Sequence, residues 1–326
     1  MNAKVLLVLL AVALLVGLHV FMGEVHMNPR EVLATAWGRP SSELHQTVLW
    51  EVRFPRVLTA ASSGVLLAWL GLLMQTWFRN PLAGPGVLGI TSGGSLGVAV
   101  AVLLGWALPT WIAASVGCFA VLLLIGFAAR RFMSPVTTLV FGLMVSYAVS
   151  AAVTVLESSA TAESIQAFVF WGMGTFGKAT FWQAISLVML VAVLGSWMRW
   201  RSEWLDMWML GEDLAQTMGI QRSRLQGEIL FLAGLVLGWV TSVCGPLAFL
   251  GLAVPHVYRF FHEARSHRSS IGGVAAWGVL LALAADGLVR WTDSVGGGHW
   301  PLNAVLAMFG APVVISVLWK RTHDWS

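Results

Sequence analysis

The hydrophobic positions of this chain fall into long runs, and polar residues are confined mostly to the short stretches between them. A run of about 20 apolar residues is long enough to cross a bilayer as a helix. The eighth run is shorter than a bilayer, which predicts a half-helix or a helix buried among the others. The pattern therefore predicts an all-α, polytopic membrane protein whose single transmembrane domain fills residues 1–326. We expect about ten spans, near residues 4–22, 57–77, 88–106, 108–129, 136–156, 180–198, 227–244, 247–260, 272–290 and 303–319.

Composition excludes an ordinary soluble domain. The chain is 58% hydrophobic and 10% charged, whereas soluble proteins carry about 25% charged residues. The net charge of +4 does not indicate nucleic-acid binding, because the basic residues lie singly or in pairs rather than on one clustered face. The apolar run from Val5 to Met22 is longer than a signal-peptide core, so we take it as the first span.

The basic residues also predict the orientation. With the amino terminus in the cytoplasm, 13 of the 19 Lys and Arg residues lie on the cytoplasmic side of the predicted spans. This satisfies the positive-inside rule and predicts a multi-pass protein with both termini in the cytoplasm. The six on the outside are Arg30, Arg39, Arg53, Arg56, Lys178 and Arg290.

Two short motifs flank the second span. Arg53 and Arg56 surround a proline just outside it, where arginines ordinarily reach toward the interface as anchors. Asn80, Pro81 and Leu82 open a segment rich in proline and glycine at the other end. Irregular backbone at that depth is tolerated only where it is packed in protein or lines a cavity.

The polar loop between the sixth and seventh spans contains a predicted short helix. Gly211 precedes Glu212 and Asp213, which suit a helix start, and Gly219 suits its end. An apolar stripe along this helix would require a partner protein, although a solvated connector is the alternative. The stripe consists of Leu210, Leu214, Met218 and Ile220.

Candidate chemistry within the spans is sparse. His256 has no second ligand at metal spacing, so we expect a structural role and no metal site. Asp286 lies four residues before Arg290, a spacing that allows an ion pair on one helix. Cys118 and Cys244 are expected to be small buried hydrophobic side chains. Tryptophans at span ends, among them Trp77 and Trp208, are expected to be interfacial anchors.

These motifs resemble the FecCD-type family of ABC importer permeases, which carry ferric siderophores, haem and cobalamin. The chain departs from the family pattern at Trp300, and only loosely matches it at the turn Ser134–Pro135. The matching segments are RxPR at 53–56, MQxxxxNPLAxPGxLG at 74–89, LGxxxAxxxG at 210–219, GPxxFxGLxxPHxxR at 245–259, and a final segment over 301–312.

The resemblance implies a type II ABC importer permease. Two permease subunits, expected to be a homodimer, would work with two cytoplasmic ATPase subunits and a periplasmic substrate-binding protein in the lipid of the bacterial inner membrane. This chain would bind no cofactor, and the ATPase subunits would use ATP and Mg. Residues 203–225 would form a cytoplasmic coupling loop. The implied roles are binding-protein docking for Arg53, Arg56 and Arg290; ATPase coupling for Leu210, Gly211, Glu212, Asp213, Leu214, Ala215, Met218 and Gly219; and a cytoplasmic gate for Asn80, Pro81, Leu82, Ser134 and Pro135.

The predicted function is import of an iron complex, a ferric siderophore or haem, with cobalamin as the alternative. The chain has no GxxxxGK[ST] loop, so it is expected to be a transport subunit and not an enzyme. A membrane-bound polyprenyl transferase would need clustered acids, and an ion-driven secondary transporter would need ionisable residues in several spans. Both patterns are weak in this sequence.

Overall fold

The computed structural model describes residues 3–21, 23, 25–40, 42–132, 135–263, 266–296, 298 and 300–323. Within these ranges every regular element is a helix, and each of the ten predicted runs corresponds to one. Seven helical segments are long and apolar enough to cross a membrane. The ten helices are α1 Ala3–Phe21, α4 Phe54–Trp77, α5 Ile90–Leu103, α6 Thr110–Phe132, α7 Pro135–Ser158, α9 Phe181–Trp200, α12 Arg222–Cys244, α13 Leu250–Phe261, α14 His267–Ser294 and α15 Leu302–His323.

Shorter helices connect these spans. The prediction of an all-α polytopic fold is confirmed, and α13, with 12 residues, is the expected half-helix. The connecting elements are α2 Pro29–Ala36, α3 Glu43–Thr47, the π-helix η1 Val48–Arg53, the 3-10 helix η2 Pro85–Leu88, α8 Ala162–Gly172, α10 Ser202–Leu210 and α11 Glu212–Thr217.

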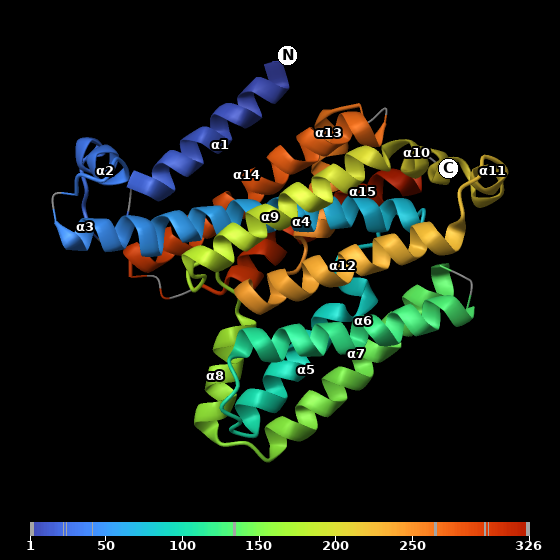
Figure 1. The fold of residues 1–326 in the computed structure, drawn as a ribbon, viewed down its shortest axis with the longest axis horizontal. Helices are drawn as coiled ribbons and strands as arrows, with labels where there is room; N and C mark the ends of the chain where they lie inside the picture. Colours follow the sequence, from blue (N-terminus) through green and yellow to red (C-terminus); the bar gives the residue numbers. More distant parts are fainter. Residues whose placement is uncertain are drawn as a thin grey trace.

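Helix α4 is the centre of the molecule. It is buried along nearly its whole length, whereas α1 and α7 are mostly exposed. Figure 1 shows α4 running through the main body beside α9 and α14. A buried helix in a membrane must be held by close packing and hydrogen bonds, because lipid tails are as apolar as its neighbours.

Glycines allow the neighbours of α4 to approach it closely. A Cβ atom added at Gly71 would lie 1.6 Å from the carbonyl oxygen of Gly251 in α13. One added at Gly64 would lie 2.3 Å from the carbonyl oxygen of Gly278 in α14. These contacts are between backbones, so any larger residue would force two helices apart.

Helices α5, α6, α7 and α8 form a separate lobe below the main body in Figure 1. The lobe joins the body largely through α6 and α12. Cys118 in α6 lies at this contact and is buried, as is Cys244 at the end of α12. Both cysteines are therefore small buried side chains, as the sequence predicted.

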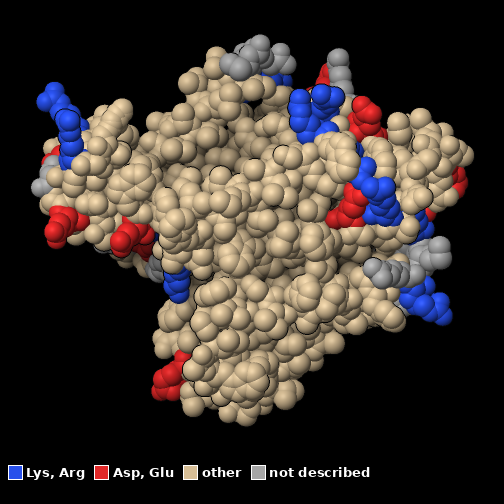
Figure 2. Space-filling model, in the orientation of Figure 1, with Lys and Arg blue, Asp and Glu red and all other residues tan. Residues whose placement is uncertain are grey.

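Contacts between distant segments agree with the predicted alternation of the two ends for α1, α4, α13 and α14. At one end, Lys4 Nζ donates to the Phe261 carbonyl (3.2 Å), and Trp208 Nε1 donates to the Trp77 carbonyl (3.1 Å). At the other, Arg56 contacts Asp286. Figure 2 shows charged side chains toward the ends of this face and a broad uncharged band between them. We call the first end, which the charge pattern predicts to be cytoplasmic, the inner end, and the second the outer end.

The prediction that Trp77 and Trp208 are interfacial anchors is wrong. Their rings stack with centroids 4.6 Å apart and planes 8° apart, and both side chains are buried. They anchor α10 to the inner end of α4 and do not face the membrane interface. The error arose because a tryptophan near a span end fits both locations, and the partner ring lies 131 residues away.

We predict that Gly71→Ala destabilises the protein strongly, because its methyl group would meet the backbone of α13. Overpacking usually costs about 1–3 kcal/mol, and the absence of a movable side chain places this variant at the upper end. Thermal unfolding in detergent measures the loss. Gly126→Ala is the control, because a Cβ at Gly126 would have no heavy atom within 4 Å. Equal melting temperatures for the two variants would contradict the prediction.

Candidate functional site

The three arginines predicted to dock a binding protein lie at the outer end but differ in exposure. Arg53 is 5% exposed. Its guanidinium group donates to the carbonyls of Val20 (2.7 Å), Phe21 (3.4 Å) and Val25. The last carbonyls of a helix lack partners within it, so Arg53 caps α1 and is turned inward. Arg56 and Arg290 are partly exposed.

A buried ion pair joins α4 to α14 at this end. Arg56 donates from Nε to Asp286 Oδ2 (2.9 Å) and from Nη2 to Oδ1 (2.9 Å), a bidentate arrangement. Asp286 is 1% exposed, and its Oδ2 lies 3.2 Å from His19 Nε2 in α1. Arg290 Nη1 donates to the His19 carbonyl (3.2 Å). Asp286 thus links three helices, where the sequence suggested only an ion pair within one.

The half-helix α13 begins at a backbone break between α12 and α13. Phe249 has φ 66°, in the left-handed region that side chains rarely adopt. Asn303 at the start of α15 supports the break, because its Oδ1 accepts from Ala248 N (3.0 Å) and its N donates to Met173 O (3.0 Å). Thr175 N donates to Cys244 O (2.9 Å). The irregular backbone is therefore satisfied by α15 and by the segment after α8, as a broken helix in a membrane requires.

A cavity of about 460 Å³ lies beside this break. Its lining comes from α8, from the turn before α13 and from α15, and Asn303 supplies its polar side chain. Such a surface offers apolar contact with few hydrogen bonds. Representative lining residues are Val169, Met173, Phe249, Asn303 and Ala307.

The predicted gate segment lies at the inner end against α13. Asn80 Oδ1 accepts from Leu82 N (2.9 Å), which fixes the turn, and Leu82 is 36% exposed. His256 Nε2 lies 2.8 Å from the Pro81 carbonyl oxygen and is buried, so its predicted structural role is confirmed. Pro135 is the first residue of α7, and Ser134 lies outside the described residues. Their gating role stays a prediction.

The predicted helix in the loop between spans six and seven is α11. Gly211 has φ 135° and separates α10 from α11, and Gly219 follows the end of α11. Leu210, Leu214 and Met218 are 72%, 47% and 56% exposed, an unusual apolar stripe at a polar end. Ile220 corrects the prediction, because it is 2% exposed and belongs to the hydrophobic core.

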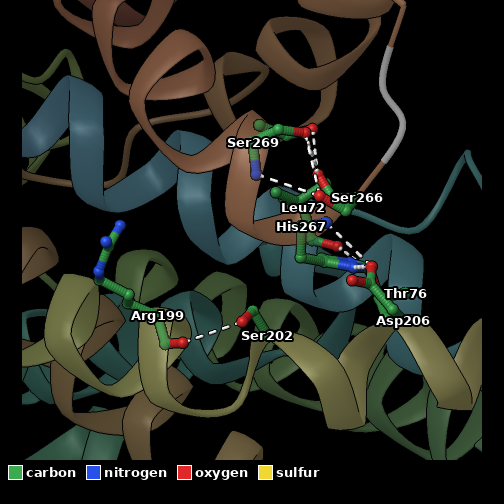
Figure 3. A network of polar contacts seen from close by, with 9 residues as sticks. Leu72, Thr76, Arg199, Ser202, Asp206, Ser266, His267 and Ser269 are labelled. Atoms are coloured by element: carbon green, nitrogen blue, oxygen red, sulfur yellow. Dashed lines mark hydrogen bonds and ion pairs between the residues drawn. The ribbon is translucent and has the colours of Figure 1, made fainter.

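A polar network that the sequence did not predict fastens α10 to the body (Figure 3). Asp206 Oδ1 accepts from His267 N (2.9 Å) and lies 2.5 Å from His267 Nδ1. On the other side of the ring, Nε2 lies 2.7 Å from Thr76 Oγ1, which donates to the Leu72 carbonyl (2.8 Å). The network links α10, α14 and α4. No local motif marks it, because Thr76 and His267 are 191 residues apart.

The part of the chain that the structure describes contains no group of three or more His, Cys, Asp or Glu side chains placed to hold a metal ion. What the fold offers instead is a broken half-helix beside an apolar cavity, and exposed apolar side chains on and beside α11, which adjoins α10, the helix fastened to the central span. These features are compatible with a membrane permease. The profile of the FecCD transport family matches residues 8–320, and the chain belongs to this family. It is an ABC importer permease, a transport component rather than a catalytic one.

Individual relatives agree with the family assignment. The chain is 32% identical over 317 residues to the vitamin B12 import system permease protein BtuC of Escherichia coli O17:K52:H18, covering 96% of this chain and 93% of that one. It is 32% identical to BtuC of Salmonella typhi, covering 84% of each. A solved structure described as an inward-facing metal-chelate type ABC transporter has the same fold, with TM-score 0.84, 24% identity, and coverage of 98% and 100%.

We predict that Asp286→Asn destabilises the protein. Removing one partner of a buried ion pair costs about 3–5 kcal/mol, and the 21% exposure of the Arg56 side chain places the effect at the lower end. Thermal unfolding of Asp286→Asn, Arg56→Gln and the double variant would show the coupling. Asp293→Asn is the control, because Asp293 is exposed on the same helix. Strictly additive losses would show that Arg56 and Asp286 do not stabilise one another.

Proposed function

We propose that this chain is the membrane permease of a binding-protein-dependent importer for a cobalamin-type corrinoid. The observation that carries the proposal is the 32% identity to vitamin B12 permeases over 96% of the chain. The sequence alone favoured an iron complex, with cobalamin as the alternative. The vitamin B12 permeases among its relatives support cobalamin. Transport of a ferric siderophore or haem is the competing hypothesis, which the uptake experiment below tests.

The permease works as a pair of subunits, expected to be two copies of this chain, around one pathway. Helix α7 supports this, because one whole face of it is uncovered and mixes apolar with hydroxyl side chains. Tyr147 and Met144 are 64% and 51% exposed there, alongside Ser150, Thr154 and Ser158. Hydroxyl groups suit a face shared with a second subunit and water better than one covered by lipid tails.

The ATPase subunits lie in the cytoplasm and bind α11, and both termini of the chain are on that side of the inner membrane. Leu214 on α11, Leu210 at the end of α10 and Met218 just after α11 present three exposed apolar side chains that fit a groove in a partner protein. The contacts of Asp206 with His267, and of His267 with Thr76, would carry movement of α10 and α11 into α14 and α4. ATP and Mg are used by these subunits, and the chain supplies the moving pathway.

The binding protein docks at the outer end. Arg56 and Arg290 are partly exposed there and could meet carboxylates, which would steer encounter and fix the register. Arg53 is covered, and its part in docking would require it to leave the carbonyls at the end of α1. Charge reversal at Arg56 would also break its pair with Asp286, so Arg56→Lys is the better probe of docking.

We predict that Leu214→Lys prevents stable association with the ATPase subunit and lowers uptake at least tenfold, because a charge would replace an apolar contact at the centre of that interface. Co-purification from native membranes measures association. Leu33→Lys is the matched control, because Leu33 is 59% exposed on α2 at the opposite end. Normal association of the Leu214→Lys variant with the ATPase subunit would contradict the coupling role of α11.

We predict that the transporter, reconstituted with the ATPase and binding protein of the same source, carries labelled cyanocobalamin in an ATP-dependent way. Excess unlabelled cyanocobalamin should abolish the signal, whereas excess ferric hydroxamate or haem should leave it unchanged. Uptake of labelled iron chelate without uptake of cobalamin would contradict the substrate assignment. It would still support the assignment of the protein as an importer. No ATP-dependent uptake of either compound would contradict the broader proposal.

A further inference from the structure

A groove of about 1300 Å³ separates α6 from α12 at the inner end. It exceeds the roughly 300–1,000 Å³ of a small-molecule pocket. Its walls are apolar and come from the spans themselves, while α11 and the start of α12 close its inner end. The apolar wall includes Phe119, Leu123, Phe127, Leu230 and Phe231.

The length of the groove matches one leaflet of a bilayer. Phe119 lies 12 residues before Arg131, the last charged residue of α6, so it is about 18 Å away along the helix. Phe231 lies nine residues after Arg222, or about 14 Å. Half of a hydrocarbon core of about 30 Å is about 15 Å. The groove therefore extends from the polar end of these helices to about the middle of the membrane.

Two buried donors at the inner end of the groove have no acceptor among the described residues. These are Arg222 Nη2 and Gln226 Nε2. Gln226 is 7% exposed, and both residues line the groove. The other terminal nitrogen of Arg222, Nη1, donates to Glu212 Oε1 (2.7 Å), which holds the guanidinium group in place. A buried unpaired donor costs about 1–3 kcal/mol unless a ligand or water accepts from it.

The charge at this end is positive. Arg201 and Arg224 share the carboxylate of Glu228, and Arg222 pairs with Glu212. Three arginines thus meet two carboxylates. Arg131 adds an exposed basic residue at the end of the facing helix. An anion is the ligand that this arrangement attracts.

We propose that this groove binds an anionic glycerophospholipid of the cytoplasmic leaflet. The phosphate accepts hydrogen bonds from Arg222 Nη2 and Gln226 Nε2, and an acyl chain lies along the aromatic and aliphatic wall between α6 and α12. Basic pockets between transmembrane helices on the cytoplasmic side are suited to such headgroups. A protein loop is a poor occupant, because its backbone polar groups would be unsatisfied at that depth.

Because of the position of the site, a bound lipid would affect transport. Its headgroup would contact the arginine that ties α11 to the start of α12 through Glu212. Its chain would fill the space between the lobe and the main body. The bound lipid thereby stabilises the position of the helix that meets the ATPase. The inference rests on the membrane orientation in the proposed function and is independent of the substrate.

Lipid retention by the purified full-length chain tests this proposal directly. Native mass spectrometry in detergent, with phosphatidylglycerol or phosphatidylethanolamine added, should show tighter retention of phosphatidylglycerol. Gln226→Leu and Arg222→Gln should each weaken phosphatidylglycerol binding about tenfold or more, as expected when a hydrogen bond to a charged group is lost. Arg268→Gln is the control, because Arg268 is exposed at the inner end on another helix.

A second variant tests the apolar wall. Gly227→Leu should place a side chain in the groove, because Gly227 lines it and a Cβ there would have no heavy atom within 4 Å. It should abolish retention, whereas Gly272→Leu, at an equally open position on α14, should not. Equal retention of both lipids, or unchanged binding in Gln226→Leu and Gly227→Leu, would overturn the proposal. Loss of the ATPase subunit from Gly227→Leu, with no lipid bound to the unmodified chain, would assign the groove to that subunit instead.

Discussion

The contact between α4 and α14 is the constraint on which the rest of the fold depends. It is fastened at three levels: the ion pair of Arg56 with Asp286 at the outer end, the glycine crossing at Gly64 and Gly278, and the pair Thr76 with His267 at the inner end. A hydrophobic driving force cannot hold helices together in lipid, so polar and backbone contacts must do so. Because these contacts occur at both ends and between them, a movement of α4 relative to α14 would have to break all three.

Other elements are arranged around this rigid pair with different degrees of attachment. Helix α13 crosses α4 at Gly71 with backbone contact, and α10 is tied to both helices through Asp206 and the stacked tryptophans. The lobe of α5–α8 is joined mainly through α6 and α12, and a large groove lies at the inner end of that contact. Movement between the lobe and the body would break fewer contacts than movement within the body. The groove is therefore placed where an occupant could affect that movement.

Local sequence was sufficient to predict where the helices lie along the chain, but not which side chains contact one another between helices. Each apolar run predicted a helix, seven of which lie in segments long and apolar enough to cross a membrane, and Gly211 and Gly219 predicted the bounds of α11, because helix length and helix ends depend on nearby residues. Asp286 was assigned a neighbour on its own helix, yet its partner Arg56 is 230 residues away. Ile220 was counted with the exposed stripe although it is buried. Such contacts depend on which helices pack together, and no local pattern records that.

The ionisable residues of the spans fit the proposed dependence of transport on separate ATPase subunits. Asp286 and His267 contact residues on other helices, and Glu228 at the start of α12 joins Arg201, which follows α9. These groups hold helices together, so changing their charge during transport would weaken the fold. The cavity beside α13 carries Asn303 as its polar side chain. An ion-driven transporter needs ionisable groups that face its pathway and change charge with each cycle. When the charged groups of a permease hold its helices together, its conformational change is better driven by a partner protein. A helix such as α11 would be the point of contact in the proposed function.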